Sequence, residues 1–365
     1  MRIPFLDLRR QHDELRPELD RALAAVLDGD RFVGGPRVEA FEDEFAAFCG
    51  VREAVGVASG TDAVELSLRA LGVRPGDEVI TAANTCVPTV AGIEAAGATP
   101  VLVDVDETTC TLDPSELAGA TTSRTRAIVA VHLYGQCADL EAIGTYAREH
   151  GLTIVEDAAQ AHGAALGGRL AGGLGDAAAF SFYPTKNLGA VGDAGAVVTD
   201  DPRVAEAVRE LRSFGERSGG AAVRRGSNSR LDPLQAAILS LKLPRLNCWN
   251  DRRRELATMY RDGLGDAVSL PVEAAGRHHV YHLFVIRSPA RDALAAELER
   301  RGIGTLIHYP RAVHEHPAYA TLARPGRLGR SERLARVVLS LPLYPELTDD
   351  EARSVADAVR AAHDV

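Results

Sequence analysis

Several features that mark whole classes of protein are scarce or absent in this sequence. Its 365 residues carry a formal charge of −10, so it lacks the excess of positive charge with which nucleic-acid-binding proteins neutralise phosphates. Its longest apolar runs have the length of strands and are broken by glycine, proline or charge, which argues against a membrane-spanning helix. The N-terminal stretch MRIPFLDLRRQHDELRPELD also lacks the apolar core of a signal peptide.

Cysteine is rare and irregularly placed. The five cysteines are an odd number and form no C-x-x-C pair, so the sequence predicts reduced thiols and a cytoplasmic protein. They are Cys49, Cys86, Cys110, Cys137 and Cys248.

Lysine is almost missing. Lys186 and Lys242 are the only lysines, so arginine supplies the other 39 of the 41 basic residues. A guanidinium stays protonated, whereas an ε-amine can lose its proton and act as a nucleophile. A lysine retained in such a sequence is therefore a candidate for amine chemistry, the alternative being that two remain by chance.

What the sequence does contain is a regular alternation of short apolar runs and amphipathic segments. Strands with uninterrupted apolar cores, separated by helices, predict an α/β fold with a mostly parallel sheet of about seven strands covered on both faces. The predicted strands are 55–59, 78–82, 99–105, 126–133, 152–157, 177–182 and 195–199. The helices expected before and among them include 11–27, 38–48, 62–71, 86–96 and 139–150.

The pattern changes in the last third of the chain, which predicts a second, smaller α+β domain. Residues 231–264 are predominantly helical, with a bend expected at Pro244. Residues 279–287 and 303–310 are predicted strands flanking a helix at 291–301, and two further helices close the chain. We therefore expect a large α/β domain at 1–245, including an N-terminal helical segment, and a small domain at 246–365.

Two segments in the large domain carry groups suited to a ligand, the first of them to an anion. At Ala58–Asp62 a predicted strand ends, Gly60 permits a tight turn and a helix begins with free N–H groups, to which Thr61 adds a hydroxyl. The alternative there is an ordinary helix N-cap. Asp157 ends another predicted strand, where α/β sheets place their ligands. The alternative for this carboxylate is a helix cap or a structural ion pair.

Lys186 follows a buried strand that contains Ser181 and precedes a glycine-rich stretch. Aromatic and apolar neighbours predict a partly desolvated amine with a lowered pKa that can form a Schiff base. The alternative is a lysine whose stem is buried and whose charge reaches solvent. A phosphate anchor, a carboxylate at a strand end and a sheltered lysine together are what pyridoxal 5′-phosphate requires. The lysine holds the cofactor and the acid keeps its pyridine nitrogen protonated.

The chain resembles the DegT/DnrJ/EryC1/StrS sugar aminotransferases, which are pyridoxal-phosphate enzymes of the aspartate-aminotransferase fold, fold type I. The resemblance runs nearly end to end and rests on segments in the family's order. These are FLDL (5–8), ASGTDAVELSL (58–68), VEDAAQAHGA (155–164), FSFYPTKNLG (180–189), GSNSRLDPLQAAIL (226–239) and HYP (308–310).

The resemblance implies a role for each matching residue. Lys186 would be the Schiff-base lysine and general acid/base, Asp157 would pair with the pyridine nitrogen, and Gln160 would lie near the ring hydroxyl. The phosphate would be held by Gly60, Thr61 and Ser181, and the substrate would contact Tyr183, His308 and Tyr309.

Two further residues follow from the same resemblance. Asn228 would reach the phosphate of the neighbouring subunit, which implies a homodimer with shared active sites; locally it could equally be a turn or N-cap residue. Cys86 stands where the family usually stacks an aromatic ring on the cofactor, which leaves the stacking partner open.

The resemblance implies transamination of a nucleotide-linked keto sugar, with dTDP as the expected nucleotide and L-glutamate as donor, in deoxysugar, antibiotic or surface-glycan biosynthesis. Residues 212–215, RSFG, resemble the Arg-x-Tyr-Gly of members that act at C3, which favours a 3-keto-6-deoxyhexose. A 4-keto-sugar aminotransferase and a non-catalytic regulatory member are the alternatives. A dehydratase would carry histidine in place of Lys186, and a cysteine desulfurase would need a mobile catalytic cysteine. The C-terminal histidines lack zinc-site spacing and are expected to be structural or to contact substrate, so no metal site is expected.

Overall fold

The computed structural model describes residues 2–217, 220–323 and 326–363. A seven-stranded sheet with the strand order β1-β9-β8-β5-β4-β2-β3 forms its centre. All neighbouring strands pair in parallel except β9, which is antiparallel to both β1 and β8. The strands are β1 (Glu53–Val57), β2 (Glu78–Ala82), β3 (Thr99–Val103), β4 (Thr125–Val131), β5 (Thr153–Asp157), β8 (Ala177–Ser181) and β9 (Gly195–Thr199). The predicted mostly parallel seven-stranded sheet is thereby confirmed.

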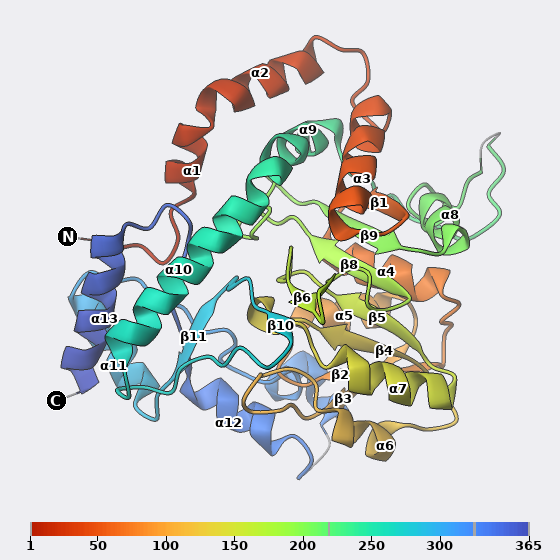
Figure 1. Cartoon of the computed structure of the whole chain (residues 1–365). Coiled ribbons are helices and arrows are strands. Elements are labelled where there is room, and N and C mark those ends of the chain that lie inside the picture. The colour runs from red at the N-terminus through yellow and green to blue at the C-terminus, as the bar shows by residue number, and fades with distance from the viewer. Residues whose placement is uncertain (1, 218–219, 324–325, 364–365) are drawn as a thin grey trace.

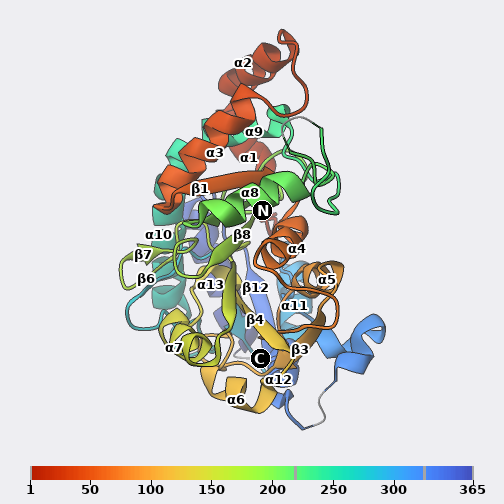
Figure 2. The same cartoon turned by 90° about the vertical axis from the view of Figure 1, so that its right-hand side faces the viewer.

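Helices cover both faces of this sheet because successive strand residues point to opposite sides. In β4, Ile128 and Ala130 pack into one apolar cluster, and Ala127 and Val129 pack into another. The first cluster includes residues of α3 (Pro36–Cys49), α6 (Leu117–Ala120), α7 (Leu140–His150) and α9 (Pro233–Lys242); the second includes residues of α4 (Gly60–Ala70), α5 (Val87–Ala95) and α8 (Pro202–Leu211). Figure 2 shows α4 and α5 on one side of the strands and α7 on the other.

A further hydrophobic cluster lies in the C-terminal part of the chain. The long helix α10 crosses the molecule (Figure 1) and packs against α13, with Leu256 and Tyr260 fully buried between the elements. The N-terminal residue Ile3 joins this cluster and pairs with Ile303, so the start of the chain packs against its last third. The elements are α10 (Leu246–Leu264), β11 (Phe284–Arg287), α11 (Arg291–Arg300), α12 (Gly329–Val337), β12 (Val338–Leu341) and α13 (Asp349–His363). A domain boundary near residue 245 stays a prediction.

Several boundaries differ from the sequence expectations. The predicted helix 11–27 is two helices, α1 (Leu8–Glu14) and α2 (Arg16–Leu27), which meet at Leu15. The bend at Pro244 is present as a short 3₁₀ turn, Leu243–Arg245, between α9 and α10. The remaining short elements are β6 (Ala165–Leu166), β7 (Arg169–Leu170), β10 (Arg277–His278) and 3₁₀ turns at Pro114–Glu116, Leu133–Gly135, Val313–Glu315 and Pro317–Leu322.

The strand predicted at 303–310 is wrong. This segment makes only single bridges at Ile303 and Leu306, because β12, which the sequence did not predict, pairs with β11 instead. The predicted strand 279–287 is correspondingly shortened to 284–287. Across the described ranges, no helix is long and apolar enough to cross a membrane.

Candidate active site

A pocket of about 430 Å³ lies beside the C-terminal ends of β5 and β8 and the start of α4. Parallel sheets expose their ligand sites at this edge, so the location agrees with the general rule for α/β folds. Nearly all of the predicted site residues line it: Gly60, Thr61, Cys86, Asp157, Gln160, Ser181, Tyr183, Lys186, His308 and Tyr309. Asn228 does not.

Lys186 lies in the loop that follows β8. Its backbone N–H donates to the Tyr183 carbonyl at 2.8 Å, and the Ala190 N–H donates to the Phe182 carbonyl at 2.8 Å, which closes the loop on itself. Desolvation lowers the pKa of the Lys186 amine, against the opposing influence of Cys86 and Asp157. With a lowered pKa, a larger fraction of this amine is neutral, and the neutral amine is the nucleophile. Lys186 is therefore more reactive than an exposed lysine.

Asp157 ends β5 with its side chain almost buried and held in place. One carboxylate oxygen accepts a hydrogen bond from the Thr89 hydroxyl at 2.7 Å, and the other accepts from the Ala159 N–H at 3.2 Å. Thr89 comes from α5 and also contacts the Thr85 hydroxyl at 2.8 Å. No sequence pattern pointed to Thr89, because a single threonine inside a helix has nothing that links it to a carboxylate 68 residues away.

The start of α4 meets the end of β8 very closely at Gly60. A Cβ atom on Gly60 would lie 2.6 Å from the Ser181 Cβ, so only glycine lets the helix start approach that strand end. The Ser59 hydroxyl accepts from the Asp62 N–H at 3.1 Å as an N-cap. Ser59 is therefore an ordinary helix N-cap, which was the alternative interpretation of this segment. Gly60 and Thr61 nevertheless line the pocket at a helix N-terminus that suits an anion.

Gln160 is held by hydrogen bonds to two segments that are distant in the sequence. Its side-chain oxygen accepts from the Tyr134 N–H at 2.7 Å, and its amide nitrogen donates to the Tyr309 hydroxyl at 3.0 Å. Burial raises the pKa of the Cys86 thiol, and the neighbouring Tyr309 opposes this shift. Cys86 stands in place of the usual aromatic residue, so which residue would stack on the cofactor ring stays open.

Two histidines from the C-terminal part of the chain complete the pocket. The His308 Nδ1 lies 2.8 Å from the Ser340 hydroxyl, and burial together with the Lys186 charge lowers the His308 pKa to about 4. The His282 Nδ1 lies 3.0 Å from the Asn187 side-chain oxygen, and burial lowers its pKa well below the usual value. The sequence grouped His282 with structural or substrate-contacting histidines but did not place it beside the lysine loop.

Asn228 is exposed and lies outside the pocket. Its neighbour Ser229 is buried, donating to the Asp62 carboxylate at 2.7 Å and accepting from the Ala58 N–H at 3.1 Å. The 226–230 loop is thereby attached to the segment that carries Gly60, with Asn228 free of that attachment.

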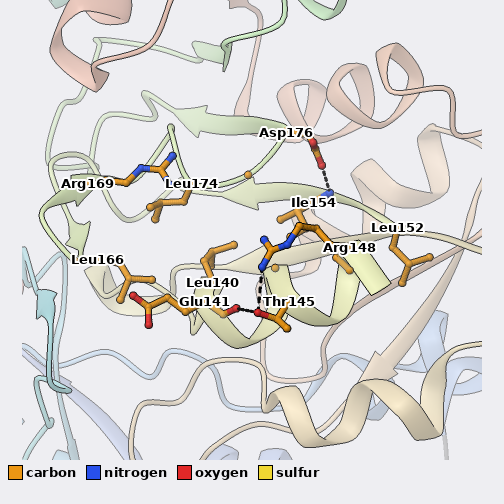
Figure 3. Close-up of a pocket in the computed structure, with 14 residues that line it drawn as sticks. Leu140, Glu141, Thr145, Arg148, Leu152, Ile154, Leu166, Arg169, Leu174 and Asp176 are labelled. Carbon is orange, nitrogen blue, oxygen red and sulfur yellow. Dashed lines mark hydrogen bonds between the residues drawn. The ribbon is translucent and has the colours of Figure 1, made fainter. Parts of the chain in front are cut away.

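A larger pocket, of about 530 Å³, lies elsewhere, between α7, the start of β5 and the 166–176 segment (Figure 3). It contains Ile154 from the N-terminal half of β5, the wrong end of a parallel strand for a ligand site, and it holds none of the predicted residues. We therefore assign the chemistry to the smaller pocket. Within the described residues, no group of three or more His, Cys, Asp or Glu side chains could hold a metal.

The residues of the smaller pocket fit pyridoxal 5′-phosphate. The missing Cβ of Gly60 lets the N-terminus of α4 lie against Ser181, and these two together form a cradle suited to a phosphate. The carboxylate of Asp157 is fixed by two donors, and the Lys186 amine is desolvated. These are the three groups the cofactor needs, gathered around one cavity.

Comparison with known proteins points the same way. The sequence model of the DegT/DnrJ/EryC1/StrS aminotransferase family matches residues 13–360. A dTDP-3-amino-3,4,6-trideoxy-alpha-D-glucose transaminase of Streptomyces venezuelae is 52% identical, over 98% of this chain and 96% of its own. A pleiotropic regulatory protein of Geobacillus stearothermophilus is 44% identical, over 98% of both chains.

Solved structures are similar as well. The crystal structure of DesV from S. venezuelae superposes with a TM-score of 0.98 and 51% identity, covering 100% of this chain and 99% of that one. NtdA from Bacillus subtilis, with bound cofactor PMP, gives a TM-score of 0.92 and 32% identity, covering 100% of this chain and 86% of that one.

Proposed function

This chain belongs to the DegT/DnrJ/EryC1/StrS aminotransferase family, and we propose that it aminates C3 of a dTDP-linked 3-keto-6-deoxyhexose with L-glutamate as donor. The observation that carries the proposal is the meeting of Lys186, Asp157 and the Gly60 cradle around one pocket. The S. venezuelae relative is named for a dTDP sugar that bears its amino group at C3, which supports both the nucleotide and the position.

Each group in the pocket then has a task. When bound, pyridoxal phosphate supplies a carbonyl that takes up the amino group and a ring that withdraws electrons from the carbon losing its proton. Lys186 would move that proton with its Nζ, because burial lowers the pKa of its amine and so makes the neutral, proton-accepting form easier to reach. The Asp157 carboxylate would hold the proton on the ring nitrogen, and the start of α4 with Ser181 would hold the phosphate.

The substrate side is formed by residues from the C-terminal part of the chain. His308 and Tyr309 line the same cavity as Lys186, so a sugar in the pocket would lie within their reach. Since burial and the Lys186 charge lower the His308 pKa to about 4, this ring is neutral at pH 7 and can donate or accept one hydrogen bond to a sugar hydroxyl.

The regulatory alternative is weakened by the same pocket. One relative carries a regulatory name, yet this chain retains both the lysine and the acid that catalysis needs, facing one cavity. A protein that only bound a sugar would need neither group. The 4-keto sugar remains the alternative substrate and is tested directly below.

We further propose a cytoplasmic homodimer in which Asn228 reaches the partner's phosphate. Asn228 is exposed and pairs with Ser213, next to Phe214, whose side chain is 50% exposed. Val223, whose N–H donates to the Gly215 carbonyl, is 47% exposed. The Arg230 guanidinium lies 5.7 Å from the Phe214 ring centre, which adds positive charge to this surface. Exposed apolar side chains next to a phosphate site are well suited to a partner subunit.

Two experiments test the proposed function. Borohydride reduction of the cofactor-loaded protein, followed by peptide mapping, should label Lys186; a label on Lys242 would contradict the assignment. Purified protein should then be assayed with L-glutamate and a panel of dTDP-linked sugars. We expect 3-keto sugars to react and 4-keto sugars to react far more slowly, and the reverse order would overturn the C3 assignment.

A further inference from the structure

Lys242, the other lysine of the chain, is buried and contacts the loop that carries Lys186. It is the last residue of α9 and only 1% exposed, and its Nζ donates to the Gly189 carbonyl at 2.8 Å. Burial lowers its pKa to about 8, against a smaller opposing influence of Glu346, with which it forms no ion pair among the described residues. Burying an ammonium without an ion pair is costly. The hydrogen bond to Gly189 offsets part of that cost, so the amine is held in one place by this contact.

The Gly189 carbonyl sits at a tight point of the Lys186 loop. A Cβ on Gly189 would lie 2.4 Å from the Pro184 carbonyl oxygen, so the chain doubles back there with no room for a side chain. The loop is closed by the bond from the Ala190 N–H to Phe182. A buried backbone carbonyl needs a donor, and Lys242 supplies it from outside the loop.

The segment after Lys186 is held at other points as well. The Gln235 side chain, near the start of α9, accepts from the Val191 N–H at 2.9 Å. Asn187 donates to the Asn250 side-chain oxygen in α10 at 2.9 Å. Both ends of α9 and the adjoining helix α10 (Figure 1) therefore fix the backbone on which the reacting amine is mounted.

We propose that Lys242 is a positioning residue that sets the place of Lys186 through the Gly189 carbonyl. A compact ammonium fits a buried site that accepts one donor, whereas a planar guanidinium would need more space and more acceptors. The role explains why lysine is retained here in a chain that otherwise uses arginine. The proposal rests on the proposed function, because it assigns Lys242 to the reaction of Lys186.

The test uses the whole chain and compares Lys242→Met with Val355→Ala. Methionine keeps much of the volume and removes the donor, while Val355, fully buried in α13, provides a destabilising change in the other hydrophobic cluster. We would measure the rate at which added pyridoxal phosphate develops its bound absorbance, the borohydride labelling of residue 186, and the urea midpoint. A displacement of the amine by about 1 Å should slow uptake and labelling about tenfold to a hundredfold.

Lys242→Gln, which keeps a shorter donor, should lie between Lys242→Met and wild type; it also serves if the methionine variant does not fold. Slower labelling in the Lys242 variants than in Val355→Ala, at comparable urea midpoints, supports the proposal. Equal labelling rates overturn the positioning role and leave the proposed function intact. If wild-type protein is not labelled at residue 186, the proposed function itself fails, and this inference with it.

Discussion

His162 provides a quantitative test of how the buried part of this site responds to pH. Its ring is fully buried and packs against Phe180 and Phe182, with ring centres 5.2 and 5.7 Å away. Within the described residues, neither ring nitrogen makes a well-formed hydrogen bond, and only the Ser181 backbone favours the protonated ring. Burial, with the Lys186 charge adding to it, therefore lowers the His162 pKa to about 3.

The direction of the pH effect follows from this shift. Because the folded pKa of about 3 lies below the ordinary value of 6.5, the unfolded chain takes up this proton first as the pH falls. Stability linked to His162 is present above pH 6.5 and is lost as the pH falls toward 3. At pH 5, protonation of His162 in the unfolded chain lowers the free energy of unfolding by about 2 kcal/mol. At pH 8 the same effect is close to zero.

The perturbation is His162→Phe, which keeps a flat ring against its aromatic neighbours and removes the titration. Urea unfolding followed by circular dichroism at pH 8 and pH 5 gives the free-energy difference between variant and wild type at each pH. Any change in packing contributes at both values, so only the difference between them matters. Between pH 8 and pH 5, we expect the free energy of unfolding of the variant to rise by about 2 kcal/mol relative to that of wild type.

The matched control is His150→Phe, at an exposed histidine of α7. It should leave the pH dependence close to that of wild type. If the His162→Phe variant and wild type lose stability in parallel from pH 8 to pH 5, His162 is not a buried neutral group and the reasoning is refuted. Both the wild type and the His162→Phe variant should still lose stability in acid through His279, His282 and His308, whose pKa values are also lowered by burial.

Three further predictions concern the pocket itself. Gly60→Ala places a Cβ 2.6 Å from that of Ser181, and we expect pyridoxal phosphate affinity to fall about tenfold or more by equilibrium dialysis; unchanged affinity would contradict the cradle. Asp157→Asn should lower kcat about a hundredfold or more with an unchanged circular dichroism spectrum, and near-normal kcat would show that another group holds the ring proton. Mixing Lys186→Ala with Asn228→Asp chains should restore part of the activity, because one site of a mixed dimer receives neither defect; a mixture that stays inactive after proven subunit exchange would refute shared sites.

Much of the large domain could be predicted from the sequence because buried parallel strands appear in it as uninterrupted apolar runs. Their C-terminal ends identify the ligand edge, so Asp157 and Ser181 could be expected to meet there before any coordinates. Lys186 stood out for a different reason, since its amine chemistry cannot be replaced by arginine. The resemblance to a family then assigned tasks to residues that are individually unremarkable, such as Gln160.

The tertiary structure decided the contacts between residues distant in the sequence. Thr89 reaches Asp157 and Lys242 reaches Gly189 across 68 and 53 residues, and no local periodicity records such a pairing. The same reason explains the error in the C-terminal part, where β11 pairs with residues 338–341 while 303–310 stays almost unpaired. Apolar pattern indicates that a segment can be a strand, but whether it becomes one depends on which partner lies beside it once the chain has folded.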